Sequence, residues 1–213
     1  MFGLFLKGPY RTYALIAAAF LIALGVYLLL RGDNTIRNYP SEGADVIAFG
    51  DSLIEGVGST NGKDFVSLLS QRIGYPIVNL GVSGNTTAQG LARIEELARY
   101  NPKVVLLLLG GNDHLRKVPI EETFANLGKL IEEIQSRGAI VLLLGVRGSL
   151  LGDRFEEHFE DLAERYQTAY VPDVLDGLFR RAEYMSDAIH PNDAGYTIIA
   201  DRIYPVLAPL LTP

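Results

Sequence analysis

Two short motifs place a serine, an aspartate and a histidine where they could activate a nucleophile. Ser52 lies in the sequence Gly-Asp-Ser-Leu at positions 50–53, directly after an apolar run that ends at Phe49. Near the C-terminus, Asp187 and His190 are the ends of the sequence Asp-Ala-Ile-His. A serine hydroxyl is a weak nucleophile at neutral pH, so it needs an imidazole to remove its proton and a carboxylate to orient that imidazole. The chain contains all three groups.

The position of the serine motif supports a chemical role. Ser52 follows an apolar, β-rich run, so it should lie at the carboxyl end of a strand, where open α/β sheets place their sites. The alternative is that Asp51 and Ser52 only cap a turn before the next helix. Asp-x-x-His is a common pattern by itself, and it gains meaning only from its combination with the serine motif.

The elements that must position these residues follow a regular alternation. Continuous apolar runs predict strands at Val46–Phe49, Ile77–Leu80, Val104–Leu109, Ile140–Val146 and Ala169–Val171. Amphipathic patterns predict helices at Asp64–Ile73, Thr87–Tyr100, Ile120–Ser136, Arg154–Tyr166 and about Asn192–Leu210. Apolar strands separated by helices are typical of a parallel sheet that is covered on both faces. We therefore expect an α/β fold with a mainly five-stranded parallel sheet.

Loops after the second and third predicted strands could supply hydrogen-bond donors. The glycines of the loop at 81–87 let backbone N–H groups approach a ligand, and Asn112 in the loop at 110–113 carries a side-chain amide. Each loop alone could be ordinary turn chemistry. Both should nevertheless converge with Ser52, because the carboxyl ends of parallel strands meet at one edge. Residues 147–152 follow the fourth predicted strand and could shape a groove or only turn the chain.

Together, these motifs resemble those of the SGNH (GDSL) hydrolase family, in the family's order and over roughly residues 44–210. The most similar branch comprises bacterial thioesterases, lysophospholipases and arylesterases. The resemblance implies a three-layer α/β/α sandwich of the flavodoxin-like type. It also implies that Ser52 is the nucleophile and that Asp187 and His190 complete a catalytic triad.

The same resemblance implies an oxyanion hole and a reaction. The donors would be the backbone N–H groups of Ser52 and Gly84 and the side-chain amide of Asn112. The implied reaction is hydrolysis of carboxylic esters or thioesters through an acyl-enzyme, without metal or cofactor, on a small-molecule or lipid substrate. The alternatives are a carbohydrate O-deacetylase of the cell envelope and a non-catalytic binding protein of the same fold. Residues 113–118 resemble a segment that closes over substrate in such enzymes.

An uncharged apolar run covers residues 12–30. Its 19 residues would form a helix that nearly spans a bilayer core of roughly 30 Å at about 1.5 Å per residue. The run lacks the small-x-small exit of a cleaved signal peptide, so we favour an uncleaved anchor. We expect residues 1–31 to form a single membrane anchor, residues 32–43 a tether and residues 44–213 a hydrolase domain. Flanking basic residues are almost balanced, and we expect a periplasmic or otherwise extracytoplasmic domain.

Composition and charge exclude other classes of protein. The chain has no cysteine, which excludes disulfides and thiolate metal sites. Its net charge is −6, and residues 1–40 carry +3, so the remaining chain carries −9. An acidic domain is a poor match for nucleic acid, whose binding depends on contacts between phosphates and Lys or Arg. The oligomeric state, the acyl-chain length and the leaving group stay open.

Four further polar residues have simpler explanations than a catalytic role. His114 lacks a companion at metal-ligand spacing, so we expect it to be a loop histidine. His158 sits among acidic residues, but a charged helical face is usually solvated, so we expect no metal there. Asp51 and Asp113 are expected to be local caps or hydrogen-bond partners, because neither is paired with a histidine as Asp187 is.

Overall fold

The structure is a computed structural model that describes residues 13, 16–17, 35–146 and 155–212. The chain divides into two units, residues 1–35 and residues 36–213. In the first unit, described residues 13, 16 and 17 are helical, whereas residue 35 is not. The transmembrane helix predicted for residues 12–30 therefore lies almost entirely outside the described residues. No helix within the described residues combines the length and apolar character that a membrane crossing requires.

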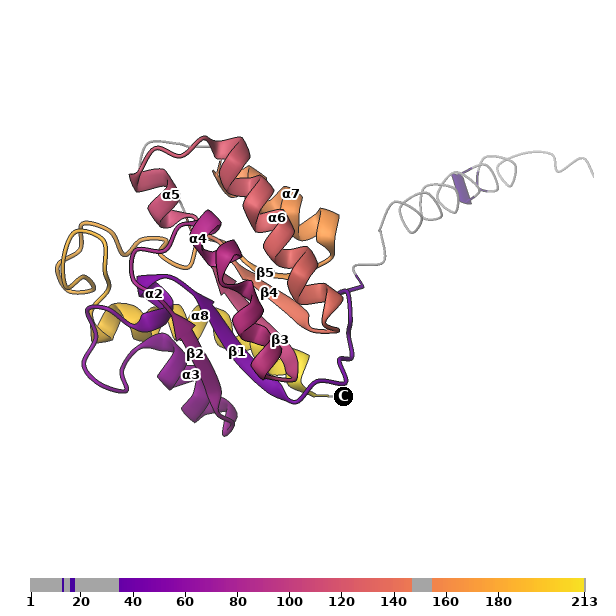
Figure 1. Ribbon diagram of the computed structural model, residues 1–213, viewed down its shortest axis with the longest axis horizontal. Helices are drawn as coiled ribbons and strands as arrows, with labels where there is room; N and C mark the ends of the chain where they lie inside the picture. Colours follow the sequence, from indigo (N-terminus) through magenta and orange to yellow (C-terminus); the bar gives the residue numbers. More distant parts are fainter. Residues whose placement is uncertain (1–12, 14–15, 18–34, 147–154, 213) are drawn as a thin grey trace, which may run out of the picture. The chain divides into compact units, whose positions relative to one another are not determined.

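A parallel sheet of five strands forms the centre of the second unit (Figure 1). The strands are β1 (Asp45–Gly50), β2 (Ile77–Gly81), β3 (Pro102–Leu108), β4 (Ile140–Leu144) and β5 (Ala169–Val171). Their order in the sheet is β2-β1-β3-β4-β5. In the register of the sheet, Gly50 of β1 pairs with Gly81 of β2 and with Leu108 of β3. The carboxyl ends of these three strands are therefore level, and the predicted parallel sheet is confirmed.

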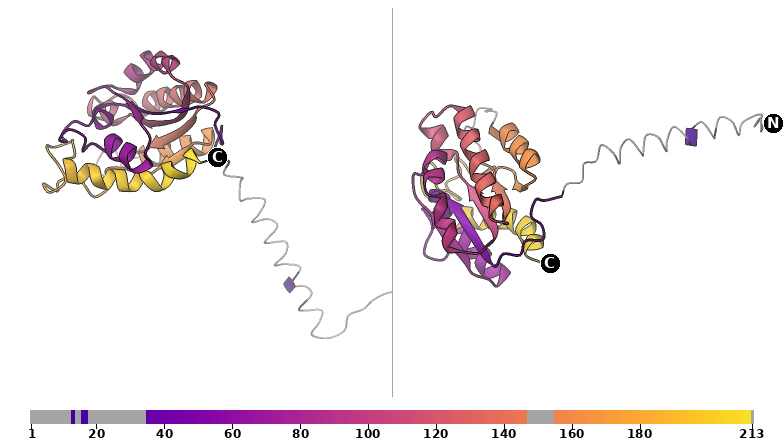
Figure 2. Two further views of the ribbon diagram at one scale, coloured as in Figure 1. Left: turned by 90° about the horizontal axis from the view of Figure 1, so that it is seen from below. Right: turned by 45° about the vertical axis from the view of Figure 1, so that its right-hand side comes forward.

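Helices cover the two faces of this sheet (Figures 1 and 2). On one face, α3 (Phe65–Ile73) packs beside α8 (Asp193–Leu211). On the other face, α6 (Ile120–Ser136) packs between α4 (Thr87–Ala92) and α7 (Phe155–Tyr166). Two short helices, α2 (Ser52–Glu55) and α5 (Gly111–Leu115), lie at the carboxyl ends of β1 and β3. The second unit is thus an α/β/α sandwich with short helices at one edge of its sheet.

The single helix predicted for residues 87–100 is divided in two. Helix α4 ends at Ala92, and a 3₁₀ helix, η1, runs from Ile94 to Arg99. Arg93 between them leaves the helical conformation, with φ −116° and ψ 11°. Its side chain donates hydrogen bonds to carbonyl oxygens at the ends of β1 and β2. Local periodicity does not reveal such contacts, because the partners are distant in the sequence.

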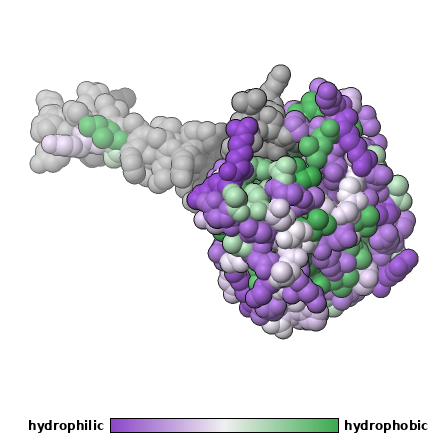
Figure 3. Space-filling model, turned by 90° about the vertical axis from the view of Figure 1, so that its left-hand side faces the viewer, coloured by the Kyte–Doolittle hydropathy of each residue, from purple (hydrophilic) through white to green (hydrophobic). Residues whose placement is uncertain are grey.

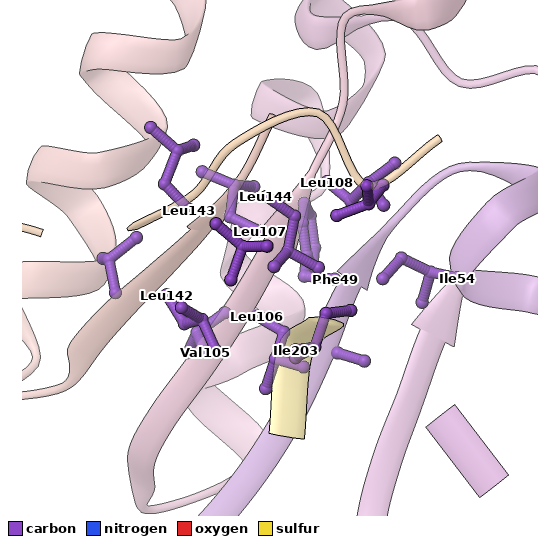
Figure 4. Close-up of a cluster of buried hydrophobic side chains, with 14 of the residues drawn as sticks. Phe49, Ile54, Val105, Leu106, Leu107, Leu108, Leu142, Leu143, Leu144 and Ile203 are labelled. Carbon is purple, nitrogen blue, oxygen red and sulfur yellow. The ribbon is translucent and has the colours of Figure 1, made fainter. Parts of the chain in front are cut away.

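The core explains why the strands contain continuous apolar runs. All residues of β4 are buried, as are those of β3 except Lys103. Figure 4 shows Leu106, Leu107 and Leu108 of β3 beside Leu142, Leu143 and Leu144 of β4, with Phe49 and Ile54 nearby. A central strand with helices on both faces has no solvent-exposed side, so its side chains do not alternate between apolar and polar. The edge strand β2 is only partly buried.

The segment at 36–43, which the sequence predicts as part of a tether, is attached to the sandwich. Asn38 Nδ2 donates to the carbonyl oxygens of Gln135 (2.9 Å) and Ala139 (2.9 Å). Ser41 Oγ donates to the carbonyl oxygen of Gly138 (2.8 Å). These acceptors lie just before the start of β4, at the amino ends of the strands. The segment is therefore bound at the edge of the sheet opposite the ends that carry Ser52.

Candidate active site

Ser52 begins a one-turn helix at the carboxyl end of β1. Asp51 caps this helix, because its Oδ1 accepts a hydrogen bond from the backbone N–H of Leu53 (3.0 Å). Gly56 ends the helix in the left-handed region, at φ 92°, which glycine adopts without strain. This strand-to-helix turn holds Ser52 at the rim of the sheet, where its side chain is nearly buried.

The serine, histidine and aspartate predicted from the two motifs are connected by hydrogen bonds, with the histidine in the middle. Ser52 Oγ lies 3.0 Å from His190 Nε2, and His190 Nδ1 lies 2.8 Å from Asp187 Oδ2. The second carboxylate oxygen, Oδ1 of Asp187, accepts the backbone N–H groups of Ile189 (2.8 Å) and His190 (2.7 Å). The hydrogen bond with His190, followed by the one from Ile189, lowers the pKa of Asp187 to about 2. The carboxylate is therefore ionised at neutral pH and faces one ring nitrogen of the histidine.

Packing between two loops brings the histidine to the serine. Gly58 follows α2 with φ 95°, and a Cβ there would collide with Ser186 Oγ and the carbonyl oxygen of Pro191. The hydroxyl of Tyr196, a buried residue of α8, donates to the carbonyl oxygen of Val57 (2.7 Å). The loop that carries the histidine is thus packed directly on the loop that follows the serine, which requires a glycine at position 58.

The three predicted strand-end loops converge, as expected. Asn112 in α5 donates from Nδ2 to Asp51 Oδ2 (3.2 Å) and to the carbonyl oxygen of Asn85 (3.1 Å). Gly84 adopts φ 77°, and its carbonyl oxygen accepts a hydrogen bond from Arg116 Nη2 (2.8 Å). Asn112 therefore connects the residue before Ser52 with the residue after Gly84.

The contacts of Asn112 contain a feature that the sequence does not reveal. A carboxamide has two N–H donors, and both have protein acceptors here, one on Asp51 and one on Asn85. In contrast, no acceptor engages the backbone N–H of Ser52 or Gly84 within the described ranges 35–146 and 155–212. Two backbone donors are thus available to a ligand. The Asn112 amide must first give up its contact with Asp51 or Asn85 before it can donate to a ligand.

Two buried aspartates support the loops, as the sequence predicts. Asp113 accepts hydrogen bonds from the backbone N–H (2.8 Å) and hydroxyl (2.5 Å) of Thr87, which joins α5 to the start of α4. Burial raises the pKa of Asp51 to about 6, although hydrogen bonds from Leu53 and Asn112 and the nearby His190 oppose the shift. Asp51 is therefore a titratable group next to Ser52.

The other two histidines, His114 and His158, make no hydrogen bond with Ser52, His190 or Asp187. His114 packs edge-on against Phe155, with ring centroids 5.6 Å apart, and His158 packs against Phe124 at 4.8 Å. Among the residues that the structure describes, no cluster of His, Cys, Asp or Glu could hold a metal ion. The loop predicted at 147–152 lies outside the described residues.

Arg93 is a residue of the site that sequence reasoning does not find. Its guanidinium contacts the carbonyl oxygens of Gly50 and Leu80 and the side-chain oxygen of Asn85. In the sequence it occupies an ordinary position within an amphipathic pattern, where an arginine predicts a solvated helix face. The only local signal is its position eight residues after Asn85, in the segment that follows the glycine-rich loop.

A parallel α/β sandwich with a serine at the end of β1, hydrogen-bonded to a histidine and through it to an aspartate, is the arrangement of an α/β serine hydrolase. Comparison with known proteins makes this class more specific. The model of the GDSL-like lipase/acylhydrolase family matches residues 48–198, and the chain belongs to that family.

Curated relatives of the chain are ester hydrolases. The chain is 33% identical over 178 residues to esterase TesA of Pseudomonas aeruginosa. The match covers 78% of this chain and 89% of the relative. It is 32% identical over 170 residues to an arylesterase of Vibrio mimicus, covering 74% and 85%. Thioesterase 1/protease 1/lysophospholipase L1 of Escherichia coli is 29% identical over 175 residues, covering 78% and 84%.

Solved structures agree with this assignment. The crystal structure of TesA has a TM-score of 0.73 and 34% identity to this chain, and the match covers 79% of this chain and 100% of that one. The predicted family is thereby confirmed. The chain is a serine ester hydrolase of the thioesterase, lysophospholipase and arylesterase type.

Proposed function

We propose that Ser52, His190 and Asp187 form the catalytic triad that hydrolyses carboxylic esters or thioesters. The observation that carries this proposal is the pair of contacts from Ser52 Oγ to His190 Nε2 (3.0 Å) and from His190 Nδ1 to Asp187 Oδ2 (2.8 Å). Both distances fit hydrogen bonds. They connect the hydroxyl that would attack the substrate with a base and with the carboxylate that orients this base.

Acylation follows from these contacts. His190 Nε2 accepts the proton of Ser52 as Oγ forms a bond to the carbonyl carbon of the substrate. Asp187 keeps the proton of the imidazole on Nδ1 and stabilises the imidazolium that forms. The tetrahedral intermediate collapses when His190 returns the proton to the leaving oxygen or sulfur. Water then attacks the acyl-enzyme, with His190 again acting as the base, and the carboxylic acid leaves.

The negative oxygen of each intermediate would be bound by the backbone N–H groups of Ser52 and Gly84 and by the Asn112 amide. The two backbone donors support this role because the described part of the chain offers them no other acceptor. Asn112 would exchange its contact with Asp51 or Asn85 for the substrate oxygen. A donor that strengthens its contact only in the transition state accelerates the reaction, typically by about 2.7–4 kcal/mol.

Apolar residues on the loops of the site favour substrates with an apolar acyl or alcohol group. Val82, Leu115 and Ile189 are 42%, 56% and 40% exposed, although their side chains are large and hydrophobic. They lie respectively in the Gly84 loop, in α5 and next to His190. Figure 3 shows patches of hydrophobic residues among hydrophilic ones on the side of the molecule that carries α2 and the loop before α8. Exposed apolar residues around a site favour a lipid or aryl ester over an acetylated carbohydrate, because an apolar acyl or alcohol group removes this apolar surface from water.

A membrane anchor at residues 12–30, with the hydrolase domain on the extracytoplasmic side, remains part of the proposed function. The 19 uncharged residues support it. Fractionation of cells that express the full chain tests this proposal. Release of the protein from membranes by salt alone would contradict it.

A series of p-nitrophenyl esters, from acetyl to long acyl chains, tests the enzymatic proposal. The detergent-solubilised full chain should hydrolyse esters with an optimum beyond acetyl, and the Ser52→Ala variant should lose this turnover. An optimum at acetyl would favour the carbohydrate O-deacetylase. Turnover that persists in Ser52→Ala would overturn the assignment of the nucleophile.

A further inference from the structure

Arg93 lies between α4 and η1, and its guanidinium reaches the carboxyl ends of two strands. Nη2 donates to the carbonyl oxygens of Gly50 in β1 (2.8 Å) and Leu80 in β2 (3.0 Å), and Nε donates to Asn85 Oδ1 (2.8 Å). The side chain is only 14% exposed. Its Cζ lies 4.1 Å from the centroid of the Phe49 ring. The guanidinium is therefore held by three uncharged oxygen acceptors and one aromatic face, in addition to a longer contact with Glu96.

The contact with Gly50 connects Arg93 to the proposed nucleophile. Gly50 precedes Ser52 by two residues and ends β1. Its carbonyl oxygen also accepts the backbone N–H of Val82 (3.1 Å), which begins the loop of Gly84. Arg93 thus binds a carbonyl oxygen that is shared by the start of the turn that carries Ser52 and the start of the loop that carries Gly84.

The contact with Asn85 connects Arg93 to the proposed oxyanion donors. Asn85 directly follows Gly84, and its carbonyl oxygen accepts a hydrogen bond from Asn112 Nδ2 (3.1 Å). The side chain of Asn85 is thus held by Arg93, while its backbone holds the Asn112 amide. A shift of Asn85 would change the positions of two donors together.

We propose that Arg93 is a positioning residue for ester hydrolysis, which fixes the spacing between the Ser52 hydroxyl and the oxyanion donors of Gly84 and Asn112. This inference rests on the proposed function and adds a residue that does not contact the substrate. The planar guanidinium of an arginine is required, because Nη2 donates to the ends of two strands while Nε donates to Asn85 in the loop that follows them. Lysine would keep the charge but present it as a point, so it could not reproduce this array.

An ion pair does not explain the position of Arg93. Its contact with a carboxylate is Nη1 to Glu96 Oε2 at 3.4 Å, and the Glu96 side chain is 35% exposed. Burial lowers the pKa of the Arg93 guanidinium, although an arginine remains protonated at neutral pH. The shorter contacts go to the ends of β1 and β2 and to Asn85 in the Gly84 loop, which is where a positioning role requires them.

The test compares Arg93→Lys with a matched control, Arg137→Lys. Arg137 is also mostly buried, at 21% exposure, and its Nη2 pairs with Glu95 Oε2 at 3.1 Å, but it contacts no loop of the site. For p-nitrophenyl butyrate we expect Arg93→Lys to lower kcat about 10²-fold with little change in KM, the size of effect that a small displacement of catalytic groups produces. The affinity for a boronic acid that forms a tetrahedral serine adduct should fall by a similar factor. The control should keep kcat, KM and this affinity within about threefold of the unmodified protein.

A second variant keeps the test decisive if Arg93→Lys fails to fold. Asn85→Ala removes only the Nε acceptor and should lower kcat and boronate affinity in parallel. Where both single variants fold, the double variant should lose much less than the product of the two single losses. Wild-type kcat and boronate affinity in folded Arg93→Lys, or in Asn85→Ala where Arg93→Lys does not fold, would overturn the proposal. A Ser52→Ala variant assayed in parallel separates the two claims, since activity in that variant would overturn the proposed function itself.

Discussion

Asp51 should make the protein less stable at pH 8 than at pH 4. Its carboxyl is buried, and this burial raises its pKa from 3.8 to about 6. The folded state therefore binds a proton more tightly than the unfolded chain does. The stabilisation from this proton is fully present below pH 4 and is lost as the pH rises through about 6. A rise from 3.8 to about 6 corresponds to about 3 kcal/mol in the free energy of unfolding.

The Asp51→Asn variant removes this titration and tests its magnitude. Urea unfolding of the solubilised protein at pH 4.5 and pH 8 gives the difference in free energy for each variant. We expect a fall of about 2 kcal/mol between these two pH values in the unmodified protein, and we expect this fall to be largely absent in Asp51→Asn. The stability of this variant at pH 8 should rise by less than this difference. Asp51 accepts from Leu53 and Asn112 through two different oxygens, whereas an asparagine has one oxygen and an NH₂ group in their place.

An exposed carboxylate provides the control for this measurement. Asp161 lies on the exposed face of α7, and Asp161→Asn should retain the pH dependence of the unmodified protein. An equal pH dependence in Asp51→Asn and in the unmodified protein would refute the reasoning, because another group would then be responsible for it.

Three further predictions concern catalysis. Asn112→Ala should lower kcat for p-nitrophenyl butyrate about 10²–10³-fold through loss of one oxyanion donor, with a smaller effect on KM; an unchanged kcat would exclude Asn112 from the hole. Asp187→Asn should lower kcat about 10⁴-fold, because an amide can stabilise the wrong imidazole tautomer, and a loss below tenfold in steady-state assays would contradict this role. Gly58→Ala should lower both the melting temperature and kcat, since the added Cβ collides with Ser186 and Pro191 at φ 95°; normal values in calorimetry and in the ester assay would show that the loop can adapt.

The sequence predicts the sheet and the motif residues because both depend on local patterns. Continuous apolar runs identify all five strands, and the structure confirms them within a few residues at their ends. Ser52, Asp187 and His190 lie in motifs whose positions relative to the strands determine where their side chains can meet. Parallel strands in one register bring the loops after β1, β2 and β3 to the same edge, so convergence follows from topology alone.

Contacts between distant residues could not be predicted in this way. Arg93 is 43 residues from Gly50, and the bonds of Asn38 reach residues about a hundred positions away. Neither contact leaves a periodic pattern in the sequence. The division of the helix at Arg93 and the attachment of residues 36–43 both result from such contacts. The two occupied donors of Asn112 are also set by tertiary neighbours.

Covalent labelling tests most directly whether Ser52 is the nucleophile. A p-nitrophenyl phosphonate releases one p-nitrophenolate as the attacking oxygen bonds to phosphorus, so the label remains on that oxygen. Mass spectrometry of the digested protein should find one phosphonyl group on Ser52, and its incorporation should parallel the loss of esterase activity. The Ser52→Ala variant should release no p-nitrophenolate above background. A label on another residue, accompanied by the same loss of activity, would contradict the proposed mechanism.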